Sequence, residues 1–217
     1  MAVDCIIFGF DANRLKLLIH KLKFEPAKGQ WSLFGGFVKE EEGLDQAANR
    51  VLKELTGLDQ VYMEELQSYG EVDRDPAGRV ISVAYYAVIP ARDYEEAGAG
   101  EDGATWVSLE DLPELIMDHS HMVEKSLRRL KRRAATQPIG FELLPREFTM
   151  PQLQALYEAI YQMELDKRNF RKKVFSMDIL IKLDKKDMST SKKGAYLYRF
   201  DQKKYQKLVD KGFSFTV

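Results

Sequence analysis

The chain is poor in the features that stabilise secreted and membrane proteins. Its 217 residues include one cysteine, Cys5, which excludes a disulfide within the chain and fits a reducing compartment. No segment approaches the roughly 20 consecutive apolar residues of a membrane span. The apolar run at 5–10 lacks a basic leader and a small-residue cleavage site, and therefore predicts a strand rather than a signal peptide. We expect a cytoplasmic protein without a membrane partner.

Net charge is also nearly absent, but its distribution is uneven. The whole chain carries −1, whereas residues 139–217 hold 16 Lys+Arg against 10 Asp+Glu, a net of +6 that leaves −7 for residues 1–138. An acidic front half and a basic back half are typical of a sensor joined to a nucleic-acid binder. Two unrelated surfaces would give the same asymmetry.

Hydrophobic periodicity predicts an α+β protein with two domains. In the first, apolar runs predict strands at 3–10, 15–21, 62–69, 79–89 and 105–108, and helical spacing predicts helices at 44–55 and 122–133. Thr136, Pro138 and Gly140 interrupt the second helix and predict a domain boundary, with domains at 1–137 and 138–217.

The second domain has two predicted helices followed by two strands. Thr149 is a good N-cap for a helix that continues to Tyr161, and Asp166 for a helix that continues to Met177. Strands are expected at 179–183 and 195–200, joined by a lysine-rich loop at 184–194. Two helices followed by a strand–loop–strand predict a winged helix-turn-helix.

The segment from Gly36 to Leu58 resembles the Nudix box. Glu42 follows Gly36 by six residues, Arg50 follows Glu42 by eight, and Gly57 closes the pattern. The resemblance implies an α/β/α sandwich around a mixed sheet, with Arg50 paired to a carboxylate of the preceding loop.

The box lacks the residues that carry its chemistry. Active Nudix enzymes present carboxylates at positions 51, 54 and 55 on one helical face and hold Mg²⁺ there. Here Val51 and Leu55 replace two of them, and only Glu54 remains. Glu40, Glu41 and Glu42 offer a rescue of the site, but such a run more often forms a solvated face. We therefore expect no metal, no cofactor and no catalytic residue.

The richest basic segment of the chain lies in the second domain. With Phe170, Val174 and Met177 buried, basic side chains of the predicted helix face outward and can reach phosphates and base edges. The alternative is a solvated basic helix. The expected DNA-binding residues are Lys167, Arg168, Asn169, Arg171, Lys172 and Lys173 of the helix, with Lys192 and Lys193 of the loop, where Lys185 and Lys186 also lie.

Together the two domains resemble the family of Nudix-related transcriptional regulators. The resemblance rests on segments 31–36, 42–58, 73–76, 80–86, 141–145, 166–173 and 197–200. It implies a homodimer on palindromic operator DNA, released by a small effector. The details look closest to the arabinose-responsive branch, so we expect a repressor of sugar catabolism released by a pentose such as L-arabinose. Alternatives are an ADP-ribose-sensing regulator of NAD metabolism, a Nudix hydrolase of ADP-ribose or a related nucleotide, and an interaction adaptor.

The same resemblance implies an effector pocket with aromatic and polar walls, which suit the C–H faces and hydroxyls of a sugar. Core packing is the alternative role for its aromatic residues, and His119 and His121 are expected on the surface or in a loop. The implied ligand-binding residues are Phe24, Glu25, Trp31, Phe34, Glu54, Asp73, Arg79 and Tyr85.

Overall fold

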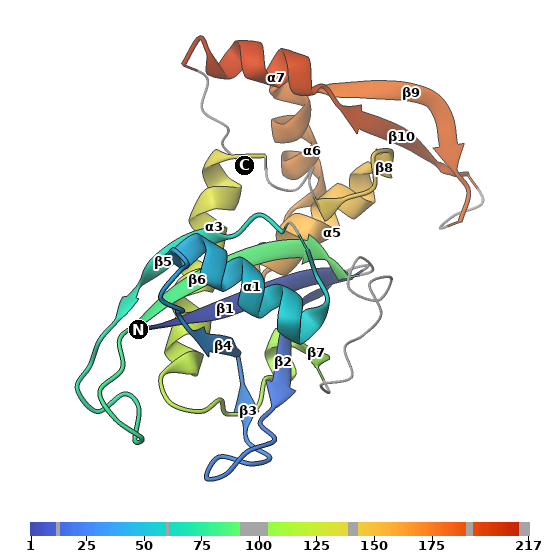
Figure 1. Cartoon of the computed structure of the whole chain (residues 1–217). Coiled ribbons are helices and arrows are strands. Elements are labelled where there is room, and N and C mark those ends of the chain that lie inside the picture. The colour runs from blue at the N-terminus through green and yellow to red at the C-terminus, as the bar shows by residue number, and fades with distance from the viewer. Residues whose placement is uncertain (12–13, 60, 92–103, 139–142, 190–192, 213–217) are drawn as a thin grey trace. The chain divides into compact units, whose positions relative to one another are not determined.

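The computed structural model describes residues 1–11, 14–59, 61–91, 104–138, 143–189 and 193–212 (Figure 1). The chain divides into two compact units, which we describe separately. Unit 1 comprises Met1–Asp11 and Leu15–Arg129, and unit 2 lies mainly in Leu130–Val217. The units divide within one long helix, and the sequence-based boundary after residue 137 stays a prediction. In the described ranges, no helix is long and apolar enough to cross a membrane.

Unit 1 is built on a seven-stranded mixed sheet with the order β3-β2-β1-β6-β5, in which β4 pairs with β1 and β7 pairs with β2. The central strands β1 and β6 run parallel, and β4 runs antiparallel to β1. Because both faces of β1 are covered, eight consecutive residues of this strand are buried. The strands are β1 (Ala2–Asp11), β2 (Arg14–Lys21), β3 (Trp31–Ser32), β4 (Phe34–Phe37), β5 (Glu64–Tyr69), β6 (Ser82–Pro90) and β7 (Thr105–Ser108).

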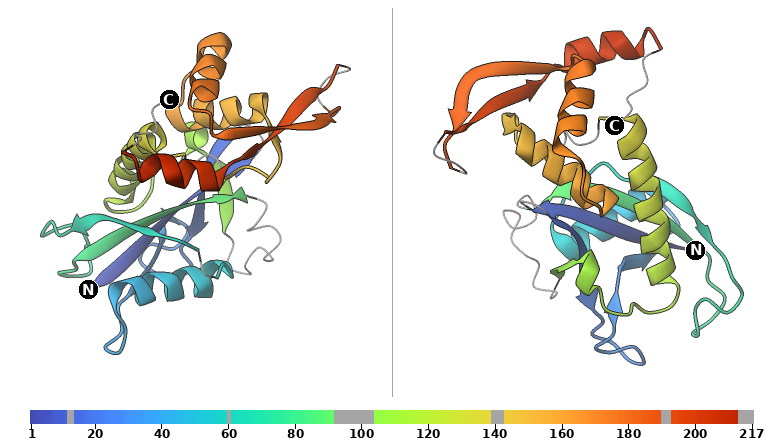
Figure 2. Two further views of the ribbon diagram at one scale, coloured as in Figure 1. Left: turned by 90° about the horizontal axis from the view of Figure 1, so that it is seen from above. Right: turned by 180° about the vertical axis from the view of Figure 1, so that it is seen from behind.

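Two helices cover the sheet of unit 1 on opposite faces, α1 (Leu44–Thr56) and the first part of α3 (His119–Thr136), as Figure 2 shows. This is the predicted α/β/α layering. The α1 helix ends at Gly57, whose φ of 73° is the left-handed C-cap conformation. The predicted helix at 44–55 is thus confirmed. The α3 helix extends three residues beyond its predicted range at each end.

Unit 2 contains a three-stranded sheet with the order β8-β10-β9, and its described residues after α3 also include the helices α5, α6 and α7. Both predicted caps are confirmed: the Thr149 hydroxyl accepts from the Gln152 N–H at 3.3 Å, and the Asp166 carboxylate accepts from the Asn169 N–H at 2.8 Å. The elements are β8 (Phe148–Thr149), α5 (Met150–Tyr161), α6 (Lys167–Ser176), β9 (Leu180–Asp187), β10 (Ala195–Phe200) and α7 (Gln202–Val209).

The wing is the strand–loop–strand formed by β9 and β10, and its first strand is longer than the sequence predicts. The β9 strand continues to Asp187, so Lys185 and Lys186 belong to a strand and not to the loop. Pairing with β10 explains the extension, because Lys186 lies opposite Tyr196 and Asp187 opposite Ala195. The sequence pattern predicts neither β8 nor α7.

Candidate functional site

The helix of the Nudix box is α1, and the two positions at which it lacks the catalytic carboxylates, Val51 and Leu55, face the hydrophobic core. Val51 is 2% exposed, and a Cβ placed on Gly36 would lie only 2.7 Å from Val51 Cγ2. Leu55 is half-buried and packs against the same core cluster. Glycine at position 36 therefore lets the β4 backbone rest directly on the valine that replaces a metal-binding carboxylate.

Arg50 pairs with two of the remaining carboxylates of the box. Arg50 donates from Nε to Glu42 Oε2 at 2.8 Å, from Nη1 to Glu54 Oε2 at 3.1 Å and from Nη2 to the Phe37 carbonyl at 2.9 Å. The hydrogen bond from Arg50, followed by that from the Lys39 N–H, lowers the pKa of the Glu42 carboxyl to about 2. The expected pairing of Arg50 with a loop carboxylate is confirmed.

These residues do not fit a Mg²⁺ site. The ion takes several oxygen ligands in near-octahedral geometry, whereas positions 51, 54 and 55 of the helix offer one carboxylate, Glu54, that already accepts from Arg50. Glu42, a residue of the proposed rescue, is also held by Arg50. Within the described part of the chain, no three His, Cys, Asp or Glu side chains are grouped to hold a metal ion.

A cavity of about 310 Å³ lies beside the box, on the segment that carries Gly35 and Gly36. The start of β1, the end of β2, the β3–β4 segment, the turn after β5 and the residues that lead into α3 form its walls. A Cβ on Gly35 would lie 2.4 Å from Asp4 Oδ1, so this glycine keeps the space around Asp4 open. The lining residues are Ala2, Asp4, His20, Leu22, Ser32, Leu33, Gly35, Gly36, Phe37, Arg74, Asp75, Val80, Ile116, Met117 and His119.

A buried ion network forms the polar end of this cavity. Arg74, whose side chain is 3% exposed, donates to both carboxylate oxygens of Asp118 at 2.9 and 2.8 Å. Its Nη2 also lies 3.4 Å from Asp4 Oδ2, which accepts from Ser82 Oγ at 2.6 Å. The cavity thus presents a fixed cation and a fixed carboxylate to any ligand.

His119 is the third polar group at this end. Burial lowers the pKa of its imidazole, against the opposing effect of Asp4 and Asp118, and so favours the neutral ring. Its Nδ1 accepts from the Leu33 N–H at 3.2 Å, which assigns the proton of the neutral ring to Nε2, 3.6 Å from Asp4 Oδ1. The expectation of a surface or loop position is wrong for His119, which is 4% exposed, whereas His121 is exposed and packs on Tyr69.

None of the eight residues predicted to bind the ligand lines the cavity, although two lie next to it. Trp31 precedes Ser32 and accepts the Ile116 N–H on its carbonyl, and Phe34 stacks on His20 with ring centroids 4.7 Å apart. Tyr85 is buried and donates to Asp45 Oδ1 at 2.8 Å. The other five are exposed: Phe24, Glu25, Glu54, Asp73 and Arg79. Their role in binding stays a prediction.

Three residues of the cavity, Asp4, Arg74 and His119, are not predicted from the sequence. A weak signal was present, because Asp4 is a lone acid in an otherwise apolar strand and needs a partner when buried. Arg74 stands between Asp73 and Asp75 in a turn, where an exposed position is the ordinary expectation.

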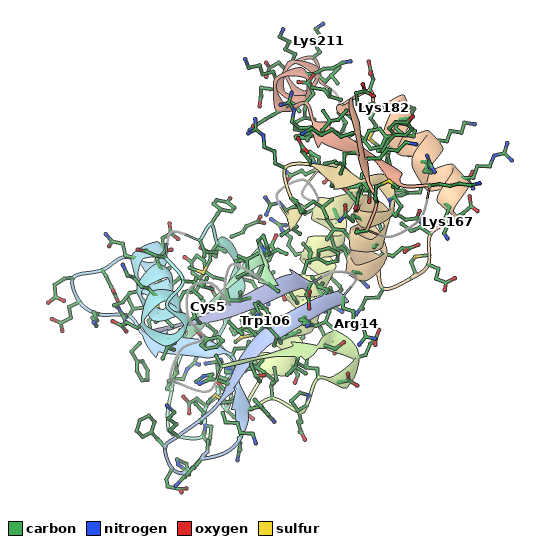
Figure 3. All side chains as sticks on the ribbon, turned by 90° about the vertical axis from the view of Figure 1, so that its right-hand side faces the viewer. Cys5, Arg14, Trp106, Lys167, Lys182 and Lys211 are labelled. Carbon is green, nitrogen blue, oxygen red and sulfur yellow. The ribbon has the colours of Figure 1, made fainter. Side chains whose placement is uncertain are left out.

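In unit 2, the helix α6 buries Phe170 and Val174 and exposes its cations. All six helix residues predicted to bind DNA are exposed: Lys167, Arg168, Asn169, Arg171, Lys172 and Lys173. Figure 3 shows Lys167 on this helix and Lys182 on β9. The geometry agrees with a basic surface, and its contact with DNA stays a prediction.

The wing carries a second cationic cluster on its strands. Lys182 and Lys186 place their ammonium groups 3.7 and 4.8 Å from the ring centroid of Tyr196, which is 41% exposed. Tyr198 and Lys182 are direct partners in the sheet, and Tyr198 packs on Phe175 of α6 at 5.6 Å. The cluster therefore shares the sheet face that meets α6. Of the predicted loop residues, Lys193 is exposed and Lys192 lies outside the described residues.

Comparison with protein families identifies both units. The NUDIX domain family matches residues 1–128, and the NrtR DNA-binding winged helix domain family matches residues 140–200.

Individual relatives cover the chain to different extents. The ADPR responsive transcriptional repressor NtrR of Acinetobacter baylyi is 32% identical over 209 residues, 94% of this chain and 83% of the relative. An ADP-ribose pyrophosphatase of Methanocaldococcus jannaschii is 36% identical over 130 residues, 59% of this chain and 73% of the relative.

Solved structures of Shewanella oneidensis NrtR are similar to this chain. The complex with a 27mer DNA aligns at a TM-score of 0.79 and 29% identity, covering 92% of this chain and 93% of that chain. The NUDIX domain of the same protein, complexed with ADP ribose, aligns at 0.53 and 29% identity, covering 59% of this chain and 86% of that chain.

Proposed function

Because the chain belongs to the NrtR-like family, in which a Nudix domain is followed by a DNA-binding winged helix, we propose that it is a transcriptional repressor that senses ADP-ribose. In this proposal unit 1 binds the effector and unit 2 binds operator DNA. A homodimer would place two copies of α6, one from each subunit, on a palindromic operator. The half-sites of such an operator are separated by one helical turn of DNA, about 34–36 Å, or a multiple of it.

The observation that carries the proposal is a cavity retained beside a disabled Nudix box. Val51 and Leu55 pack in the core where an enzyme needs carboxylates, and Arg50 engages Glu54. Without bound Mg²⁺, a pyrophosphate group in the site is neither bridged nor attacked by an activated water. A protein with this arrangement can bind a nucleotide and release it unchanged.

ADP-ribose is the effector that we favour, in place of the pentose expected from the sequence. The Acinetobacter relative is named as ADPR responsive, and the Shewanella NUDIX domain was solved with ADP ribose. No relative reported above is named for L-arabinose or any other sugar, so the assignment to the arabinose branch and to carbohydrate catabolism finds no support.

The cavity suits the nucleoside part of such a ligand. A volume of about 310 Å³ is at the small end of ligand pockets, so it accommodates one part of ADP-ribose and leaves the rest outside. The Asp4 carboxylate accepts hydrogen bonds from ribose hydroxyls or an exocyclic amine, and Leu22, Leu33 and Ile116 provide apolar walls.

The second candidate function is ADP-ribose hydrolysis, favoured by the 36% identity with the Methanocaldococcus pyrophosphatase. It requires a metal site that the box does not provide, for the reasons given above. We propose that the chain is not an enzyme.

A mobility-shift assay tests the proposal, with DNA taken from the upstream regions of the protein's own gene and its neighbouring genes. The full chain should retard this DNA, and ADP-ribose should release it, whereas L-arabinose and D-xylose should not. A 100-fold loss of operator affinity requires about 2.7 kcal/mol of coupling.

Two matched variants locate the effector site. Val80→Trp fills the cavity and should abolish the response to ADP-ribose, and Val72→Trp, at a position 77% exposed, should leave it intact. Release by a pentose alone would refute the effector assignment, and failure to bind any upstream DNA would refute the regulator.

A further inference from the structure

Unit 2 contains a second cavity, for which the proposed function has no use. It has a volume of about 540 Å³ and is formed by the residues before β8, the start of β9, the end of β10 and the start of α7. Its charged lining residues are Arg146, Arg199, Lys203 and Asp201, and Ile181 and Phe200 are among its apolar ones.

The cavity has an excess of positive charge. Three cations face one carboxylate, Asp201, which already caps α7 by accepting from the Lys204 N–H at 2.9 Å. Across the described ranges of the chain, no carboxylate pairs with Arg146, Arg199 or Lys203. A net charge of +2 that the protein itself leaves uncompensated suits a dianionic ligand.

Sheet register separates the Arg199 side chain of this cavity from the sheet face that meets α6. Arg199 and Ile181 are direct partners in the β9–β10 ladder, and the neighbouring pair is Tyr198 with Lys182. Because successive residues of a strand point to opposite faces, Arg199 lies on the face opposite Tyr198. The Tyr198 ring packs on α6, so Arg199 lies on the face of the sheet away from this helix.

We propose that this cavity binds a phosphate group, independently of the effector cavity and of operator DNA. Two guanidinium groups donate in planar forks that match phosphate oxygens, and Lys203 adds a point charge. The apolar surface of Ile181 and Phe200 adjoins these cations and takes the organic part of the ligand. The phosphate belongs either to a free nucleotide or to a nucleic-acid strand other than the operator duplex.

Amide NMR of the ¹⁵N-labelled full chain tests the proposal. Inorganic phosphate, AMP and a short single-stranded DNA are titrated separately, and the amide signals of residues 199–204 are followed. We expect saturable shifts with inorganic phosphate and with at least one of the other two, and the stronger of these identifies the source. No shift with any of the three would overturn the proposal, as would the same response to a glutamate-rich peptide lacking phosphate.

Matched variants assign the response to the cavity. Arg199→Gln should weaken phosphate binding about tenfold or more, since it removes the charge-assisted hydrogen bonds of the guanidinium. Arg146→Gln provides the same test if the first variant does not fold. Lys211→Gln, an exposed position of unit 2 outside the cavity, should bind like wild type.

Unchanged phosphate affinity in folded Arg199→Gln and Arg146→Gln would refute the site. Operator affinity, measured in parallel, should be the same in all three variants. Because the phosphate titration needs no operator, it remains decisive even if the repressor proposal fails.

Discussion

Replacing Arg74 with methionine should destabilise unit 1 by about 3 kcal/mol. The change leaves the carboxylates of Asp4 and Asp118 without their shared cation, and removing one partner of a buried ion pair costs roughly 3–5 kcal/mol. Side-chain exposures of 8% for Asp4 and 20% for Asp118 place the effect at the lower end, because water partly solvates Asp118. Such a loss is a large share of a stability that is typically about 5–15 kcal/mol.

Urea unfolding monitored by tryptophan fluorescence measures this effect in unit 1 alone. The chain has two tryptophans, Trp31 and Trp106, and both belong to that unit. Arg79→Met is the matched control, since Arg79 is exposed and its Nη1 donates one hydrogen bond to the Glu71 carbonyl at 3.1 Å. We expect the control to change stability by at most about 0.5 kcal/mol.

A double change sharpens the test. Asp118→Asn in the Arg74→Met background removes one of the two carboxylates left without a cation. It should restore about 1 kcal/mol or more of the free energy of unfolding. If Arg74→Met were as stable as the Arg79→Met control, the network would contribute nothing and its description as a buried ion cluster would be wrong.

Three further predictions concern chemistry, DNA and pH. Purified protein with Mg²⁺ or Mn²⁺ should release only trace product from ADP-ribose, and Glu54→Gln should not change that trace; turnover near the ordinary ~1 s⁻¹ would contradict the absence of catalysis. Arg168→Ala or Arg171→Ala should weaken operator binding by roughly 1–3 kcal/mol in a fluorescence-anisotropy titration, and wild-type affinity in both would show that α6 does not read bases. Glu42 has a pKa lowered from 4.5 to about 2, so its stabilising contact is present above pH 4.5 and is lost as the pH falls through 2. The stability of Arg50→Met should therefore fall less steeply than that of wild type over this pH range, and parallel curves of stability against pH would argue against the pairing.

Local signals account for what the sequence predicted well. The α1 helix has its apolar residues three and four apart and a glycine stop, and α5 and α6 begin at side chains that cap them. These signals lie within a few residues of one another, so they are readable without the fold. In contrast, the β8 strand has two residues and presents no period to detect. The α7 helix is short and none of its residues is buried, so the only pattern it offers is the spacing of Tyr205, Leu208 and Val209.

The cavity could not be predicted because its polar groups come from distant parts of the chain. Asp4 and Arg74 are 70 residues apart and meet only after β1 pairs with β6. The environment of His119 depends on Leu33, 86 residues away, which explains why a histidine between polar neighbours was assigned to the surface. The wing lysines show the same dependence, since Lys186 joins a strand through its pairing with Tyr196.

The single thiol of the chain provides a direct measurement of how often unit 1 opens. Cys5 has no exposed surface, its Sγ lies 3.6 Å from the Ala48 carbonyl, and burial raises the pKa of the thiol above its usual value. Alkylating reagents attack the thiolate, so labelling can proceed only through states in which β1 separates from α1. Because Asp4 of the cavity is the adjacent residue on β1, a ligand that binds there should slow labelling in proportion to 1 + [L]/Kd. Mass spectrometry of the alkylated protein would then rank candidate effectors without DNA and without any introduced probe.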